Sequence, residues 1–268
     1  QTDLISRIAA DFSSGIQRVC AVAPCGAGKT VVVGWMAGKT ALVNKRVLFL
    51  VHRWELIDQS DRTFTAMNIR HGIISAGVPA DYESSVQIGS VQTVARRLSR
   101  IPSPDFIIID EAHHATAGTW KKIMEAFPQA MTLGVTATPA RLDGKGLGDI
   151  FQSLVMGPSV DELIQWGNLS KYNYYAPPSK ADIKSVRIQF GDYVKSELER
   201  AVDDDALVGD IVANYQELAD GRQTVCYCVS RKHSEHTAAK FRAAGISAAH
   251  VDGETHKAER DRIISDFR

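Results

Sequence analysis

A glycine-rich string between an apolar run and a helical pattern constrains the fold more than any other feature of this chain. Residues 23–30 read Ala-Pro-Cys-Gly-Ala-Gly-Lys-Thr, after the apolar run 18–23 and before a helix predicted over residues 29–43. Glycines let successive backbone N–H groups converge on one point without clashes from Cβ atoms. The start of the helix directs its positive end toward the same point. The string therefore predicts an anion cradle at one edge of a parallel α/β sheet.

The same string matches the phosphate-binding loop Gly-x4-Gly-Lys-Ser/Thr at every position except the first, which Ala23 occupies. In such a loop the lysine, here Lys29, contacts the β- and γ-phosphates of a nucleotide, and the hydroxyl of Thr30 binds Mg²⁺. A strand–turn–helix with a purely structural role is the alternative. We expect the nucleotide-binding residues to be Cys25, Gly26, Ala27, Gly28, Lys29 and Thr30.

Two adjacent carboxylates, Asp110 and Glu111, directly follow the apolar run 106–109. Ligands of open α/β sheets bind at the carboxyl ends of the strands. We expect Asp110 to hold Mg²⁺ with Thr30, directly or through water, and Glu111 to orient and deprotonate an attacking water. The predicted catalytic residues are therefore Lys29, Asp110 and Glu111; the alternative for the pair is an ordinary acidic turn at a strand end.

Strands and helices alternate along the first part of the chain. Continuous apolar runs favour strands that are buried on both faces, and the alternation predicts a right-handed, doubly wound parallel sheet with helices on both sides. Strands are predicted at residues 18–23, 46–51, 72–75, 86–89, 106–109 and 131–135. Helices are predicted at residues 29–43, 55–67, 91–99 and 119–127.

The pattern changes near residue 141, where a glycine-rich stretch, 141–148, precedes several prolines. We predict three parts: a first domain over 1–155, a connector over 156–205, and the amino-terminal part of a second α/β domain over 206–268. The connector is expected to hold a helix at 160–166 and a short strand at 172–175. In the last part, helices are predicted at 207–218, 231–244 and from 256, and strands at 224–229 and 246–251.

Charge and hydropathy exclude some classes of function. The 31 Lys and Arg residues balance the 31 Asp and Glu residues, so the composition shows no basic face for coating DNA. No apolar run approaches the ~20 residues that span a bilayer, and no signal peptide is visible, so we expect a cytoplasmic protein without membrane contacts. Cys226 and Cys228 lack partners at zinc-site spacing and are expected to be buried thiols.

Seven strings in one order carry a resemblance to a known family. They cover nearly the whole chain, which is far more specific than any single motif. On them the chain resembles the superfamily 2 DEAD/DEAH-box helicases, and within these the group of type III restriction subunits and XPB-like DNA-repair translocases. The strings are residues 23–30, 51–60 (Val-His-Arg-Trp-Glu-Leu-Ile-Asp-Gln-Ser), 89–93 (Gly-Ser-Val-Gln-Thr), 110–113, 136–141 (Thr-Ala-Thr-Pro-Ala-Arg), 225–233 and 250–260.

The resemblance implies two RecA-like domains with ATP and Mg²⁺ in the cleft between them. Gln1 would match the family's adenine-reading glutamine, although the usual Arg-Pro-Tyr before it is absent, and an exposed polar terminus is the alternative. His113, Thr136 and Thr138 would couple the nucleotide to the nucleic-acid track. The alternatives are a structural histidine and threonines that serve turn chemistry before Pro139.

The resemblance also implies contacts with a nucleic-acid backbone. On the first domain these would come from Arg53, Gln92 and Thr93, which follow strand ends, and on the second from Ser230 and Gly253. Such contacts position a strand without reading its sequence. The alternatives are a surface charge at a helix start for Arg53 and helix capping for Gln92, Thr93 and Ser230.

The function that the resemblance implies is that of an ATP-dependent DNA helicase or translocase. The stretch 141–148, Arg-Leu-Asp-Gly-Lys-Gly-Leu-Gly, favours DNA by family analogy. An RNA helicase of the same fold, and a nucleotide-gated nucleic-acid clamp that does not separate strands, are the alternatives. Nuclease or methylase subunits are conceivable partners, in a prokaryotic or phage-like setting.

Both ends of the chain fall within helical patterns, so we expect a portion of a longer protein that is truncated at both ends. The family's second domain continues into a motif that brings an arginine finger to the γ-phosphate, and this motif would follow Arg268. An arginine finger contributes about 10³–10⁵ to the rate in phosphoryl-transfer enzymes. We therefore expect this portion to be nearly inactive as a motor by itself.

Overall fold

The structure is a computed structural model that describes residues 1–114, 118–139, 146–176, 183–189, 192–202 and 205–267. The chain divides into two compact units, Gln1–Tyr172 and Asn173–Arg268, and each is described by itself. Most of the predicted glycine-rich stretch, including Arg141, lies outside the described residues. The predicted boundaries at residues 155 and 205 stay predictions.

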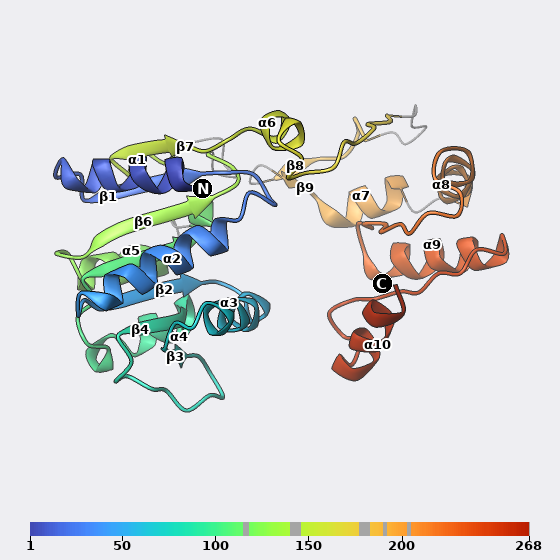
Figure 1. The fold of residues 1–268 in the computed structure, drawn as a ribbon. Helices are drawn as coiled ribbons and strands as arrows, with labels where there is room; N and C mark the ends of the chain where they lie inside the picture. Colours follow the sequence, from blue (N-terminus) through green and yellow to red (C-terminus); the bar gives the residue numbers. More distant parts are fainter. Residues whose placement is uncertain (115–117, 140–145, 177–182, 190–191, 203–204, 268) are drawn as a thin grey trace. The chain divides into compact units, whose positions relative to one another are not determined.

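The first unit is built on one seven-stranded parallel sheet with the order β3-β4-β2-β5-β6-β1-β7 (Figure 1). The parallel pairing brings the carboxyl ends of all seven strands to one edge. The predicted doubly wound parallel α/β fold is confirmed for this unit. The strands are β1 (Arg18–Val22), β2 (Val47–Val51), β3 (His71–Ile74), β4 (Val86–Ser90), β5 (Phe106–Asp110), β6 (Met131–Thr136) and β7 (Ser153–Met156).

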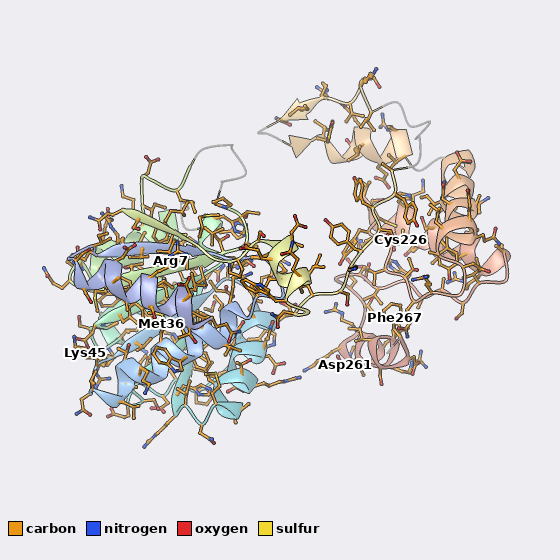
Figure 2. All side chains as sticks on the ribbon, turned by 45° about the horizontal axis from the view of Figure 1, so that its top comes forward. Arg7, Met36, Lys45, Cys226, Asp261 and Phe267 are labelled. Atoms are coloured by element: carbon orange, nitrogen blue, oxygen red, sulfur yellow. The ribbon has the colours of Figure 1, made fainter. Side chains whose placement is uncertain are left out.

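Helices cover both faces of this sheet. Two separate apolar clusters show this, because one joins the strands to α1, α2 and α3, and the other joins them to α4 and α5. Figure 2 labels Arg7 and Met36 on the helices α1 and α2 of the first face. The helices are α1 (Thr2–Ser13), α2 (Lys29–Leu42), α3 (Trp54–Ala66), α4 (Val91–Arg96), α5 (Gly118–Ala126) and α6 (Val160–Gln165), with short 3₁₀ helices at Leu98–Arg100 and Ala112–His114.

Strand β5 shows why the sequence folds in this way. Its residues alternate between the two clusters: Phe106 and Ile108 pack on one face, and Ile107 and Ile109 on the other. All four are at most 2% exposed, so the run must be apolar throughout. The run ends at Asp110, where the chain leaves the sheet.

Three local predictions before residue 176 are corrected. Strand β7 was not expected; its sequence, Ser-Leu-Val-Met, holds only three apolar residues in a row, and Leu154 and Met156 are each 48% exposed at the edge of the sheet. The helix predicted over 91–99 ends at Arg96, and a 3₁₀ helix follows. The strand predicted at 172–175 is wrong, because these residues adopt no regular structure.

The second unit contains mainly helices. Its predicted helices are present, but the strands predicted at 224–229 and 246–251 are wrong: neither run belongs to a strand. A strand requires a neighbour that accepts its backbone hydrogen bonds, and these runs have none among the described residues. The elements are β8 (Ile188–Gln189) and β9 (Asp192–Tyr193), which form an antiparallel pair, and α7 (Lys195–Val202), α8 (Asp205–Leu218), α9 (Arg231–Ala243) and α10 (Lys257–Phe267).

The absence of a strand at 224–229 also changes the surroundings of Cys226. It is exposed and Cys228 is half-buried, with 3.9 Å between their Sγ atoms, so the prediction that both thiols are buried is wrong. The neighbouring Tyr227 is 94% exposed. An apolar run without a sheet around it leaves its side chains in solvent (Cys226 is labelled in Figure 2).

Candidate functional site

The candidate site lies at the carboxyl edge of the sheet in the first unit, where β1, β6 and β5 end side by side. In the parallel register Val22 pairs with Thr136, and Val135 pairs with Asp110. The backbone N–H of Ala23 donates to the carbonyl of Thr136 over 3.0 Å. The strand bearing Thr136 therefore stands between the phosphate loop and the acidic pair.

The loop after β1 requires glycine at two positions. Gly26 and Gly28 have φ angles of 81° and 82°, a region that residues with a Cβ seldom adopt. A Cβ at Gly26 would also come within 2.6 Å of Leu169 Cδ2, and one at Gly28 would collide with the side chain of Gln1. Gly28 is the N-cap of α2, so the positive end of that helix faces the loop. This geometry is that of an anion cradle.

The structure places Gln1 against this loop. Its Nε2 donates to the carbonyl of Ala27 over 3.4 Å, and the residue itself is exposed. The side chain therefore lies beside the predicted phosphate cradle, while its predicted role in reading adenine stays a prediction.

The side chain of Lys29 donates hydrogen bonds to the backbone of the same loop. Its Nζ donates to the carbonyl oxygens of Ala23, at 3.0 Å, and Pro24, at 3.3 Å. Both oxygens belong to the turn that leads into the glycines, so the ammonium group is drawn toward the cradle and away from solvent. Thr30 follows in the first turn of α2 and is half-buried, whereas Cys25 is exposed.

The Asp110–Glu111 pair forms a tight turn. Burial and the neighbouring charge of Glu111 raise the pKa of Asp110 from 3.8 to about 6, and the positive charge of Lys29 acts in the opposite direction. Glu111 has a φ angle of 51°, and its N–H donates to Asp110 Oδ1 over 3.0 Å. The left-handed backbone costs ~1–2 kcal/mol and sets the direction of the Glu111 side chain.

His113, Thr136 and Thr138 form one hydrogen-bonded network with Glu111. The Thr136 hydroxyl donates to the carbonyl of Thr138 at 3.0 Å and accepts from the N–H of Thr138 at 3.1 Å. Because its single hydrogen is then used, it accepts from His113 Nδ1, which lies 2.9 Å away. The same Nδ1 is 3.3 Å from Glu111 Oε2. The three predicted coupling residues therefore contact one another and the predicted catalytic carboxylate.

The donor set suits Mg²⁺. Hard oxygen ligands are what this ion prefers, and P-loop proteins supply only a hydroxyl and a carboxylate beside the phosphates. Burial and the Glu111 charge raise the pKa of Asp110 to about 6, so a nearby cation would stabilise the ionised carboxylate. Among the described residues no group of three or more His, Cys, Asp or Glu side chains could hold a metal ion.

Two histidines in this region were not predicted. The ring centroids of His52 and His114 are 4.9 Å apart, and those of His113 and His114 are 4.0 Å apart. Burial lowers the pKa of both His52 and His114, and each ring also feels a neighbouring histidine. His52 immediately precedes Arg53 after a strand end, which is the signal that could have found it.

The predicted nucleic-acid residues of the first unit differ in exposure. Arg53 is exposed at the N-cap of α3. Gln92 is exposed, and its Oε1 accepts a hydrogen bond from Ser90 Oγ at 3.0 Å, whereas Thr93 is only 9% exposed. Arg53 and Gln92 therefore offer accessible polar groups, and Thr93 belongs to the packed start of α4.

In the second unit, Ser230 caps a helix. Its Oγ accepts from the N–H of His233 at 3.1 Å and donates to Glu199 Oε1 at 2.6 Å. Both hydrogen-bonding functions of the hydroxyl are thereby used. Gly253 has open space around its Cα, and no atom lies within 4 Å of where a Cβ would be.

Comparison with known proteins gives relatives over the whole chain. The 51.5 kDa protein of Lactococcus phage (isolate 7-9) is 38% identical over 245 residues, which cover 91% of this chain and 51% of that protein. IRC3 of Saccharomyces cerevisiae, named as a proposed ATP-dependent helicase, is 26% identical over 289 positions, covering 100% of this chain and 42% of that protein. The chain thus spans about half the length of the curated relatives it matches.

A restriction-enzyme subunit and a helicase of solved structure are also similar to this chain. An endonuclease subunit of the type I restriction enzyme EcoAI of Escherichia coli is 28% identical over 202 residues, covering 70% of this chain and 25% of that subunit. The UvsW helicase of bacteriophage T4 is 19% identical with a TM-score of 0.44, covering 53% of this chain and 55% of that one.

The family described as the type III restriction enzyme, res subunit, matches residues 1–141, which include the phosphate loop, the acidic pair and the network around Thr136. This match covers more than half of the 268 residues. The chain belongs to the family of the type III restriction enzyme res subunit, within the superfamily 2 helicases.

Proposed function

We propose that this chain is the nucleotide-holding part of an ATP-dependent DNA helicase or translocase. One observation carries the proposal: Lys29, the Asp110–Glu111 pair and Thr136 lie at one edge of one sheet and are joined by hydrogen bonds and electrostatic contacts. A structural strand–turn–helix does not require two left-handed glycines, a lysine drawn into the loop and a strained glutamate. Family membership supports the same activity.

The geometry assigns roles to the residues in ATP hydrolysis. The backbone N–H groups of the loop and Lys29 bind the phosphates, with Lys29 exchanging its bonds to Ala23 and Pro24 for phosphate oxygens. Thr30 and Asp110 would hold Mg²⁺, which supplies positive charge against the phosphates. Glu111 orients a water molecule and accepts its proton as the water oxygen attacks the γ-phosphorus; the bond to the bridging oxygen breaks, and ADP leaves.

The coupling role rests on the Thr136 hydroxyl. Because it bonds Thr138 and His113, and His113 in turn lies against Glu111, a shift of the segment after β6 changes the surroundings of the catalytic carboxylate. This segment leaves the sheet at the same edge as the loops of β2 and β4, which carry Arg53 and Gln92, and β5 lies between it and those strands. We propose that a DNA backbone held by those two residues communicates with Glu111 through this edge.

Replacement of Glu111 by glutamine tests the catalytic assignment. In the complete protein that carries this chain, we expect E111Q to retain ATP binding and to lose hydrolysis by at least about 100-fold, because the amide keeps the shape but cannot accept the proton. Binding is measured with a fluorescent ATP analogue and turnover by phosphate release. K29A is the companion variant and should weaken binding itself. Hydrolysis by E111Q near the unaltered rate would remove Glu111 from this role.

DNA is proposed over RNA because the restriction-enzyme relatives bear names of DNA-cleaving enzymes. Competition between DNA and RNA strands of the same sequence, measured by their effect on ATP turnover, distinguishes the two substrates. Stronger stimulation by RNA would favour the RNA helicase alternative. A strand-displacement assay beside a triplex-displacement assay then separates unwinding from translocation without strand separation.

A further inference from the structure

Three histidine rings form a row between two loops of the candidate site. His52 is the first residue after β2, and His114 ends the 3₁₀ helix that follows β5. Their ring centroids are 4.9 Å apart with the planes tilted by 58°, and the His113 ring lies 4.0 Å beyond His114. The row therefore starts beside Arg53 and ends at the network of Glu111 and Thr136.

The sheet explains why these two loops meet. Strands β2 and β5 are parallel neighbours, with Leu50 paired to Ile109, so their carboxyl ends open at the same edge. His52 lies two residues after Leu50, at the point where the chain leaves β2. The contact between His52 and His114 thus joins the loop of one strand to the turn of the next.

His114 also closes the turn that directs Glu111. Its backbone N–H donates to the carbonyl of Glu111 over 2.9 Å, next to the residue whose φ angle is 51°. On the other side of the turn, His113 Nδ1 lies 3.3 Å from Glu111 Oε2. A displacement of the His114 ring therefore moves the backbone that sets the direction of the catalytic carboxylate.

The contact acts through ring packing. His52 Nδ1 is buried and has no hydrogen-bond partner among the described residues, which is an unfavourable state for a ring nitrogen. The nitrogen therefore supplies no hydrogen bond of its own, and His52 contacts His114 through its ring.

We infer that His52 and His114 are positioning residues that transmit nucleic-acid binding at Arg53 to the Glu111 turn. The inference rests on the proposed function and deepens it. It assigns a second route to the catalytic carboxylate, separate from the one through Thr136, and this route starts at the loop after β2. A strand held by Arg53 shifts His52, the ring contact shifts His114, and the turn at Glu111 follows.

The test measures how strongly single-stranded DNA of one fixed sequence stimulates ATP turnover by the complete protein. In H52A and H114A we expect the ratio of stimulated to basal rate to fall about tenfold, which is typical of lost coupling between two sites. In H52F and H114F the ring contact remains, so the ratio should stay within about threefold of that of the unaltered protein. A purely structural role would lower both rates together and leave the ratio unchanged.

Two further variants make the result decisive. In H52A/H114A the ratio should fall no further than in either single variant, because both changes remove the same contact. H71F is the matched control: the His71 ring packs on Phe64 and bonds Asp61 in the same unit, so its replacement tests general loss of packing. We expect H71F to leave the ratio unchanged.

The outcomes separate this inference from the proposed function. If the unaltered protein hydrolyses no ATP, the proposed function fails and the inference fails with it. If the unaltered protein is stimulated by DNA but the alanine variants keep its ratio, only the inference is overturned. It is also overturned if the phenylalanine variants lose as much stimulation as the alanine variants, or if the double variant shows the product of the two single losses.

Discussion

Both units contain short apolar runs of the kind that predicts a strand, but only in the first unit do such runs form strands. In the first unit the apolar run 106–109 became the centre of a sheet with a neighbour on each side. In the second unit the run 224–229 forms no strand, and Val225 and Tyr227 are 61% and 94% exposed. An apolar run of this kind therefore forms a strand only where neighbouring strands accept its hydrogen bonds.

The contrast extends to the candidate functional residues. In the first unit the predicted residues Glu111, His113 and Thr136 contact one another, and the charge of Lys29 acts on Asp110. In the second unit Ser230 caps a helix. A site at a sheet edge depends on the register of the strands beneath it, and among the described residues only the first unit has a parallel sheet.

Removal of buried apolar volume should give the largest difference between the units. Ile108 is fully buried in β5, so Ile108→Ala should lower the free energy of unfolding by about 2–5 kcal/mol through lost burial and a cavity. Tyr227→Ala should change it by less than ~0.5 kcal/mol, because the side chain is in solvent. Urea unfolding followed by circular dichroism measures both. Equal effects would show that the run 224–229 is packed in solution, and the contrast between the units would not hold.

The pH dependence of stability should have opposite signs at two aspartates. The pKa of Asp110 is raised from 3.8 to about 6, so its ionisation opposes folding and stability falls as the pH rises through this window. Asp110→Asn should remove that loss and stabilise the metal-free chain at pH 7.5 by at most about 3 kcal/mol, with little effect at pH 3.

Asp252 of the second unit provides the control for this prediction. Hydrogen bonds from Thr255 and Glu254 lower the pKa of Asp252, so its contribution to stability is present at neutral pH and is lost as the pH falls. Asp252→Asn should therefore reduce stability at pH 7.5, where Asp110→Asn increases it. Urea unfolding at the two pH values checks both signs. A destabilised Asp110→Asn at pH 7.5 would contradict the burial of the ionised carboxylate.

The smallest expected effect concerns two helix caps, one in each unit. Ser159 starts α6 in a capping box with Glu162, and Ser230 starts α9 with a bond to His233. Replacement of either serine by alanine should cost about 1 kcal/mol, because an N–H at the helix start loses its acceptor. Thermal unfolding of the two variants measures this. Similar losses would mean that capping stabilises helices equally in both units and that the units differ in their strands. A loss near zero for Ser230→Ala would show that the helix cap of the second unit is not formed.

Much of the first unit could be predicted from sequence, for identifiable reasons. The phosphate loop is a local pattern, in which strand, glycines and helix follow one another, and the positive φ angles of Gly26 and Gly28 agree with it. The apolar runs of the inner strands are continuous because they are buried on both faces. Asp110 could be placed at the sheet edge because the run before it ends abruptly.

What could not be predicted depends on contacts between distant residues. Strand β7 is held in part by the side chain of Gln152, which accepts hydrogen bonds from the N–H groups of Gln17 and Arg18, and no local pattern shows this pairing. The contact between the rings of His52 and His114 forms because β2 and β5 are neighbours in the sheet. Neither the sequence around His52 nor the sequence around His114 indicates this order of strands. The failed strands of the second unit have the same cause.

The left-handed backbone at Glu111 has a consequence for how this position responds to substitution. Glycine would adopt the same φ angle without a steric cost, whereas glutamate retains it at the expense of stability. Stability and the proposed role in hydrolysis therefore favour different residues at a single position. Replacement of Glu111 by glycine would therefore relieve the backbone and at the same time remove the carboxylate that the proposed hydrolysis requires.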